Sequence, residues 1–400
     1  MAKKKTNDDE FFSKMAKNTG GMTLDIAGKV PYFIDTGSLS LNFQCSGKFA
    51  KGGIPGGRIT EVYGPPATSK SLLGYCCLGN CQRMGGVSVL LDCERAGSAD
   101  FAKNAGHVDP SRLITYEPIS IQQVEKKIIA ATKEIRAYYG LDVPILFVWD
   151  SIGVTPTDRE WNETELPENP TQAQLKAIGL ERPGERARAS GDLLRKTNPF
   201  LNEQNASLFV INQIRQKIGV MFGSPETTAG GGQALEFYAS CRLRTSAMKK
   251  IENELGLPVG VNLRFENKKS RSATPGIKTE GVQLFFHHGI NPLGGLLSIL
   301  LATERIKVSG KGTYKVSEPY ADGRDITFKA SSVRNDVPVA PLLAAPKLID
   351  LETEQEVLDY LAPYASAMEF AANGGIVEKV IKSDGEEEDT PEFIKDLQAE

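Results

Sequence analysis

The segment at residues 64–71 constrains the fold more than any other part of the chain. It reads Gly-Pro-Pro-Ala-Thr-Ser-Lys-Ser, follows a β-branched run at 58–63 and leads into an apolar run at 71–78. A strand that turns through a tight loop into a helix brings backbone N–H groups to a helix N-terminus, where the helix dipole favours anions. The segment therefore predicts a loop that binds the phosphates of a nucleotide.

Two side chains of this loop suit that chemistry. Lys70 would reach the β- and γ-phosphates, and Ser71 would ligate Mg²⁺. The match to the pattern G-x-x-x-x-G-K-[ST] is incomplete, because a serine stands at the second glycine position. An ordinary strand-to-helix turn with a surface lysine is the alternative. The predicted nucleotide-binding residues of the loop are Gly64, Pro65, Pro66, Ala67, Thr68, Ser69, Lys70 and Ser71.

Two carboxylates follow strands that we expect in the same sheet. Residues 87–92 and 145–151 are largely apolar, as parallel strands covered on both faces should be. Glu94 follows the first run, and Asp150 lies at the end of the second. Because the carboxyl ends of parallel strands meet at one edge, Glu94 is placed to activate water and Asp150 to hold Mg²⁺. Together with the loop, this pattern favours a nucleotide hydrolase.

The composition is that of a globular protein with room for one large core and a smaller second domain. Of the 400 residues, 40% are hydrophobic and 24% are charged. No run is long and apolar enough to cross a bilayer, and no apolar stretch follows the basic N-terminus, so we expect a cytoplasmic protein without a membrane partner. The six cysteines and three histidines have no metal-ligand spacing, so no zinc is expected.

The net charge of −3 hides an uneven distribution. Residues 384–400 contain eight acidic residues and one lysine, so the remainder of the chain has an excess of positive charge. Cations gather at 182–196 and again at 264–278. An acidic tail on a locally basic body predicts a screen that competes with polyanions, and a solvated terminus without function is the alternative.

Two segments outside the predicted sheet suit a nucleic acid. Residues 161–185 are rich in Glu, Pro, Asn and Gln, which predicts a long loop, and the helix after it carries Arg188 and Arg195 on one face. Residues 214–232 follow the apolar strand at 207–213 and combine glycines, apolar side chains and the cations Arg215 and Lys217. That mixture suits a polyanion with bases that can stack.

The second of these segments resembles a known family. The runs 211–215, 217–223, 225–228 and 237–240 are similar to the second DNA-binding loop of the RecA recombinases, and in its departures the chain resembles the recombinases of tailed phages. Similar stretches at 36–41 and 57–59 extend the resemblance to roughly residues 33–300. It implies an α/β fold: a RecA-like P-loop NTPase core with a mainly parallel central sheet, an N-terminal helix and a small C-terminal α+β domain.

The resemblance also implies roles for particular residues. Glu94 would be the base, Lys70 and Ser71 would hold phosphate and Mg²⁺ with Asp150, and Gln213 would sense the γ-phosphate. Phe101 and Phe286 would flank the adenine of ATP, and Phe237 would lie between subunits. The DNA-binding residues would be Arg188, Arg195, Arg215, Lys217, Gly230 and Gly231. Cations reaching the ATP of a neighbouring subunit would come from Lys268, Lys269 or Arg271, since glutamate replaces the first lysine of the family's Lys-Asn-Lys strand; the sequence leaves the choice open.

A function and a domain division follow from the resemblance. The chain would form a helical filament on single-stranded DNA, pair it with homologous duplex DNA, hydrolyse ATP in a DNA-stimulated manner and meet mediator and single-stranded-DNA-binding proteins. The expected parts are an N-terminal helix and linker at 1–33, an ATPase core at 34–290 with DNA loops at about 157–187 and 214–232, a small domain at 291–382 and an acidic tail at 383–400. A ring helicase and a non-catalytic DNA-binding paralogue are the alternatives.

Overall fold

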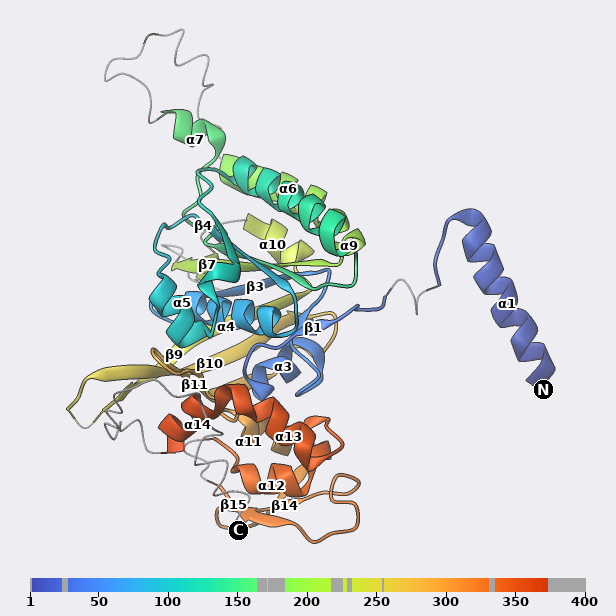
Figure 1. Cartoon of the computed structure of the whole chain (residues 1–400), viewed down its shortest axis with the longest axis vertical. Coiled ribbons are helices and arrows are strands. Elements are labelled where there is room, and N and C mark those ends of the chain that lie inside the picture. The colour runs from blue at the N-terminus through green and yellow to red at the C-terminus, as the bar shows by residue number, and fades with distance from the viewer. Residues whose placement is uncertain are drawn as a thin grey trace.

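The computed structural model describes residues 2–23, 28–163, 171, 184–216, 226–228, 232–253, 255–330 and 335–372. Its centre is one large sheet with the strand order β12-β11-β10-β9-β3-β7-β6-β4-β5, and β8 pairs with β7 outside that order. Helices cover both faces of this sheet, and a smaller C-terminal module lies at one end (Figure 1). The α/β class predicted from the sequence is confirmed.

The part of the sheet that carries the loop is parallel. It consists of β3 (Ile59–Gly64), β4 (Val87–Asp92), β5 (Leu113–Tyr116), β6 (Ile145–Asp150), β7 (Ala206–Gln216) and β9 (Cys241–Glu252). Beyond β9 the sheet continues antiparallel through β10 (Pro258–Ser270), β11 (Lys278–Phe285) and β12 (Gly289–Ile290). The sheet is therefore mixed, with the parallel strands that the sequence predicts at its centre.

Side chains of the central strands alternate between two apolar cores, one on each face of the sheet. Leu146 and Val148 pack under α4 (Lys70–Arg83) and α5 (Ala99–Gly106). Phe147 and Trp149 pack on the other face, with α6 (Ile121–Tyr139), α9 (Glu185–Glu203) and α10 (Gly232–Tyr238). Burial on both faces explains why these strands read as continuous apolar runs.

Two segments are more ordered than the sequence predicts. Trp161, predicted to lie in a loop, belongs to α7 (Asp158–Glu163), because Thr157 and Glu160 exchange hydrogen bonds that begin a helix. Residues 214–216 extend β7 and pair with β8 (Glu226–Thr228), although the sequence predicts that the strand ends at residue 213. Lys217, Gly230 and Gly231 lie outside the described residues, as does the acidic tail.

The N-terminal helix α1 (Ala2–Thr19) lies within the segment where the sequence predicts an N-terminal helix and linker. It lies apart from the body of the protein (Figure 1), and its apolar side chains Phe11, Phe12 and Met15 are exposed. The chain then enters the body through β1 (Phe33–Ile34), which pairs with β2 (Ile54–Pro55), and through α3 (Leu39–Ser46). Since α1 does not pack on its own body, its apolar side chains are available to another surface.

The C-terminal module has the α+β composition that the sequence predicts. Its elements are α11 (Leu296–Ala302), β13 (Ile306–Gly310), β14 (Thr313–Val316), β15 (Thr327–Lys329), α12 (Val339–Ala344), α13 (Glu354–Leu361) and α14 (Ala365–Ala372). Leu39 and Phe49 join its apolar core, so the module packs on the α3 region. In the described part of the chain, no helix has the length and hydropathy needed to span a membrane.

Candidate nucleotide-binding site

The loop between β3 and α4 adopts the left-handed backbone that its glycine pattern demands. Ala67 and Ser69 have φ angles of 57° and 53°. A serine in this conformation is strained by roughly 1–2 kcal/mol relative to its usual backbone, whereas glycine is not. A Cβ on Gly64 would lie 2.3 Å from the carbonyl oxygen of Thr245, so this first position requires glycine. Ser69 therefore supports the same turn as the glycine it replaces.

The loop forms one wall of a cavity of about 730 Å³, a volume in the range of small-molecule sites. Residues from widely separated parts of the sequence meet there. The predicted site residues that line it are Pro66, Ala67, Thr68, Ser69, Lys70, Ser71, Glu94, Phe101, Asp150, Gln213 and Phe286. Gly64 and Pro65 precede the lining residues. The structure thus brings the predicted loop, both carboxylates, the glutamine and both aromatic rings to one place.

Lys70 is buried without a charged hydrogen-bond partner. The residue is only 7% exposed. Its Nζ donates to the carbonyl oxygen of Pro65 at 2.6 Å and to Thr68 Oγ1 at 3.3 Å. Burial lowers the pKa of this ammonium, while the charges of Asp150 and Glu94 raise it. Among the described residues, the hydrogen bonds of this buried cation go to a carbonyl oxygen and a hydroxyl, an arrangement that suits an anionic ligand entering the cavity.

The carboxylates lie at the ends of neighbouring strands, where Asp92 of β4 is opposite Asp150 of β6. Burial raises the pKa of Asp150 to about 6; a hydrogen bond with Ser71 lowers it, and the charges of Glu94 and Asp92 raise it further. Glu94 Oε1 accepts a hydrogen bond from Ser151 Oγ at 2.7 Å. Asp92 accepts one from the backbone N–H of Gly97 at 2.8 Å, so it holds the following loop.

Ser71 and Asp150 could share a divalent cation with a bound phosphate. Within the described ranges, no group of three or more His, Cys, Asp and Glu side chains is placed to hold a metal. A magnesium ion here would take its remaining ligands from phosphate oxygens and water, which is its usual preference. The hydroxyl and carboxylate already in contact fit such a partly filled set of ligands.

The other end of the cavity is apolar. Phe101 and Phe286 line it, and Phe101 packs edge-on against Tyr75 with ring centroids 5.9 Å apart. Ser98 acts as the N-cap of α5, because its Oγ accepts from the backbone N–H of Phe101 at 3.3 Å. Ser98 thus positions an aromatic side chain of the cavity.

The sequence did not predict the contribution of the β9–β10 hairpin to this wall. Met248, Lys249 and Lys250 of β9 line the cavity, together with Pro258, Gly260 and Val261 of β10. Two adjacent lysines in a strand gave a weak local signal. Only the antiparallel pairing of β9 with β10 carries them to the edge of the site.

Gln213 lies beside the loop because β7 and β3 are parallel neighbours in register. Gly64 is directly opposite Gln213, whose backbone N–H donates to Asn212 Oδ1 at 2.9 Å. Asn212 in turn donates to Glu61 Oε1 at 2.9 Å. The glutamine is therefore held at the cavity by a buried network on two neighbouring strands.

The predicted interface residues gather around the end of α10, outside the cavity. Phe237 is 70% exposed. Lys269 Nζ donates to the carbonyl oxygens of Glu236 and Phe237 at 2.6 and 2.8 Å, and Arg271 donates to that of Phe237 at 3.3 Å. Lys268 pairs with Glu266 at 2.8 Å. None of the three cations lines the cavity of this chain.

The predicted DNA-binding cations are only partly within the described residues. Arg188 and Arg195 are exposed on α9, and Arg195 pairs with Asp192 at 2.8 Å. Arg215 lies in β7, but the structure does not describe its side chain, and Lys217, Gly230 and Gly231 lie outside the described residues.

The chain is similar to bacterial proteins along most of its length. It matches the family model described as the RecA N-terminal domain over residues 20–291, a span that contains every residue lining the cavity. Protein RecA of a Caulobacter species is 31% identical over 340 residues, which cover 84% of this chain and 87% of that protein. For Protein RecA of a Nocardioides species the identity is 34% over 277 residues, 69% and 71% of the two chains. For that of Mycoplasma mycoides it is 31% over 273 residues, 68% and 72%.

Proposed function

The chain belongs to the RecA family, and on that basis we propose that it is an ATP-dependent recombinase that assembles on single-stranded DNA and exchanges strands with a homologous duplex. RecA-family proteins are DNA-dependent ATPases, and this chain has that activity. One observation supports the assignment to these particular residues: the loop, Glu94, Asp150 and Gln213 surround a single cavity although they are far apart in sequence.

Each group has a distinct task in this proposal. When nucleotide binds, Lys70 donates to phosphate oxygens in place of the carbonyl oxygen of Pro65, so the buried ammonium gains a negatively charged partner. Ser71 and Asp150 hold Mg²⁺, which when bound neutralises phosphate charge. Glu94 takes the proton of the attacking water, while Ser151 keeps its carboxylate oriented. Gln213 contacts the γ-phosphate and begins the segment that meets DNA.

The filament and its DNA contacts rest on the exposed residues. We propose that Arg188 and Arg195 contact the DNA backbone with Arg215, Lys217, Gly230 and Gly231. Phe237 and the apolar side of α1 would dock on neighbouring subunits, since both are exposed in the single chain. Lys268, Lys269 or Arg271 would reach the neighbour's ATP. Base pairing would supply sequence specificity, so the protein itself should bind with weak sequence preference.

Several finer predictions stay predictions. These are the division at 1–33, 34–290, 291–382 and 383–400, the cytoplasmic location, the phage-type branch, and the mediator and single-stranded-DNA-binding partners. The ring helicase and the non-catalytic paralogue are less favoured than the recombinase. Family membership argues against the first, and the left-handed backbone of Ser69 argues against the second because it preserves the loop.

An ATPase assay with and without single-stranded DNA tests the proposal. We expect DNA to stimulate turnover, Lys70→Ala to abolish nucleotide binding and Glu94→Ala to retain binding while turnover falls by about 10²–10⁴-fold. Turnover no higher than that of the two variants would favour the non-catalytic paralogue. Electron microscopy with single-stranded DNA and a slowly hydrolysed ATP analogue should show filaments; closed hexamers alone would favour the helicase.

A further inference from the structure

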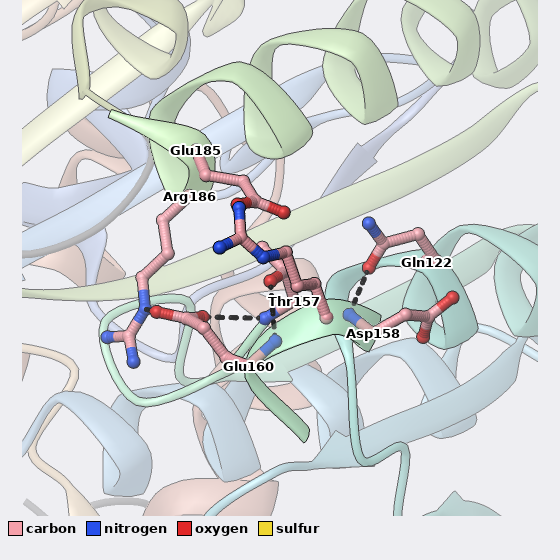
Figure 2. A network of polar contacts seen from close by, with 7 residues as sticks. Gln122, Thr157, Asp158, Glu160, Glu185 and Arg186 are labelled. Atoms are coloured by element: carbon pink, nitrogen blue, oxygen red, sulfur yellow. Dashed lines mark hydrogen bonds and ion pairs between the residues drawn. The ribbon is translucent and has the colours of Figure 1, made fainter. Parts of the chain in front are cut away.

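Two ion pairs join helix α7 to the start of helix α9, on either side of the segment at residues 164–183. Arg159 donates from Nη1 to Glu185 Oε2 at 2.8 Å, and Arg186 donates from Nε to Glu160 Oε1 at 2.6 Å. Figure 2 shows the Glu160 carboxylate directed at Arg186, with Glu185 beside Arg186 at the start of α9. We refer to Arg159, Glu160, Glu185 and Arg186 as the clasp.

The order of charges in the clasp specifies one register. Consecutive residues of α7 are positive then negative, and their partners at the start of α9 are negative then positive. A shift by one residue would bring Arg159 against Arg186. The Arg159–Glu185 pair is also partly buried, with side chains 15% and 29% exposed, so solvent screens it less than a surface pair. The clasp therefore determines how the first helical turn of α9 is seated.

Helix α7 is itself fixed by hydrogen bonds at its first turn. The backbone N–H of Thr157 donates to Glu160 Oε2 at 2.8 Å, and that of Glu160 donates to Thr157 Oγ1 at 3.2 Å. The N–H of Asp158 donates to Gln122 Oε1 at 3.0 Å, a contact visible in Figure 2. The same Glu160 carboxylate thus caps α7 and binds Arg186, so the cap and the clasp depend on one side chain.

A short buried connection links α7 to the carboxylate edge of the nucleotide site. Ser151 donates to Glu94 Oε1, and its carbonyl oxygen accepts from Thr155 Oγ1 at 2.8 Å. Thr155 Oγ1 also accepts from Trp149 Nε1 at 3.0 Å, and Thr157 follows two residues later with its side chain buried. Few rotatable groups separate Glu94 from the clasp, so a movement of Glu94 can be transmitted to the clasp through packed side chains.

We propose that the clasp is a positioning device that couples the nucleotide site to the DNA-facing side of α9, which carries Arg188 and Arg195. This inference rests on the proposed recombinase function. Glu160 and Arg186 contact neither the nucleotide cavity nor, in this role, the DNA. They hold the first turn of α9 against α7, and α7 follows the strand that ends at Asp150. The clasp thereby sets where the arginines lie when the site is filled.

The substitution Glu160→Gln separates this role from simple electrostatics. Glutamine retains an oxygen that can accept from Thr157, so the cap is kept while the ion pair with Arg186 is lost. Removing a negative charge near DNA should by itself tighten binding. If the clasp positions the arginines, Glu160→Gln instead weakens binding to a fluorescent oligo-dT, with an ATP analogue present, by about fivefold or more.

Turnover measurements and matched variants complete the test. DNA-stimulated ATPase should fall with DNA affinity in Glu160→Gln, while DNA-independent turnover stays within about twofold. Arg159→Glu should behave like Glu160→Gln, and the charge exchange Arg159→Glu/Glu185→Arg should recover most of the loss. Glu125→Gln is the control. It breaks the pair with Lys196, which joins α9 to α6 away from the first turn of α9, and it should not weaken DNA binding.

The outcomes are distinct. Unchanged or tighter DNA binding by folded Glu160→Gln overturns the inference, and so does a charge exchange that is no better than Arg159→Glu alone. If Glu160→Gln does not fold, Glu185→Gln decides by the same comparison, because it also removes a negative charge and one pair of the clasp. A wild-type protein that binds no single-stranded DNA would overturn the proposed function instead, before any variant is compared.

Discussion

Glu61 of β3 and Arg242 of β9 form a buried ion pair on the strands that lead to the candidate nucleotide-binding site. Glu61 Oε2 accepts from Arg242 Nε at 2.5 Å, and the two side chains are 0% and 8% exposed. The other Glu61 oxygen accepts from Asn212, and the guanidinium also binds Glu236 at 2.5 Å and lies over the Tyr63 ring. One network, buried at Glu61, Asn212 and Arg242, therefore connects the strand before the loop, the strand of Gln213 and the helix of Phe237.

Breaking this pair should destabilise the protein strongly. Glu61→Gln leaves the Arg242 guanidinium buried with incomplete compensation, so we expect the free energy of unfolding in urea to fall by about 3 kcal/mol or more. Glu280→Gln is the control, because its pair with Arg264 is as short, at 2.6 Å, but about half exposed. That change should cost at most about 1 kcal/mol. Similar losses in both variants would contradict the importance of burial.

The stability of the nucleotide-free protein should depend on pH through Asp150. Its pKa is raised from 3.8 to about 6, so the folded state binds the proton more tightly than the unfolded state. The contribution of this group is fully present below pH 3.8 and is lost as the pH rises through about 6. Asp150→Asn removes this dependence, and relative to the variant the wild type should lose up to about 3 kcal/mol between pH 4 and pH 7.5.

Urea unfolding of both proteins without Mg²⁺ or nucleotide, at a series of pH values, measures that difference. A free-energy difference that stays constant across the series would show that Asp150 titrates near its ordinary pKa. Adding Mg²⁺ and an ATP analogue should stabilise the wild type more than Asp150→Asn at neutral pH, because the carboxylate then has a counter-charge.

Ser151 should influence turnover more than nucleotide binding. Its hydroxyl donates to Glu94, so Ser151→Ala leaves the carboxylate less well oriented. We expect kcat to fall by roughly 3–10-fold with the Kd for nucleotide within about twofold, as for other groups that orient a reacting residue. Ser88→Ala is the matched control, since Ser88 is equally buried but donates to the Leu78 carbonyl oxygen. Equal effects on kcat would argue against the positioning role.

Two glycine-to-alanine changes in helices should have opposite signs. A Cβ on Gly79 of α4 would lie 2.1 Å from the carbonyl oxygen of Gly106, at the contact with α5. Gly79→Ala should lower the unfolding free energy by about 1–3 kcal/mol and weaken nucleotide binding, because α5 carries Phe101. Gly191 of α9 has only the Ala234 Cβ within reach, at 3.7 Å, so Gly191→Ala should raise stability by up to about 1 kcal/mol. Thermal unfolding of the two variants distinguishes these outcomes.

The elements that could be predicted from the sequence are those that a short run of adjacent residues encodes. The strands at 87–92 and 145–150, the loop and the helix after it each follow from runs of adjacent residues, and so do the positions of Glu94 just after β4 and Asp150 at the end of β6. Gln213, expected at a strand end, lies within β7, which continues to Gln216. Trp161 was assigned to a loop because its neighbours are polar. The hydrogen bonds between Thr157 and Glu160, together with the clasp, outweigh that composition.

By itself the sequence determined that a tight loop joins a strand to a helix and that two carboxylates lie at or just after the ends of neighbouring strands, because backbone periodicity and strand ends are encoded within a few residues. Only the tertiary structure decided that the β9–β10 hairpin closes the cavity, that Glu61 is neutralised by Arg242, and that Glu160 binds Arg186. These contacts join residues far apart in the chain. Their partners are selected by how the whole sheet and its helices pack, which no local pattern records.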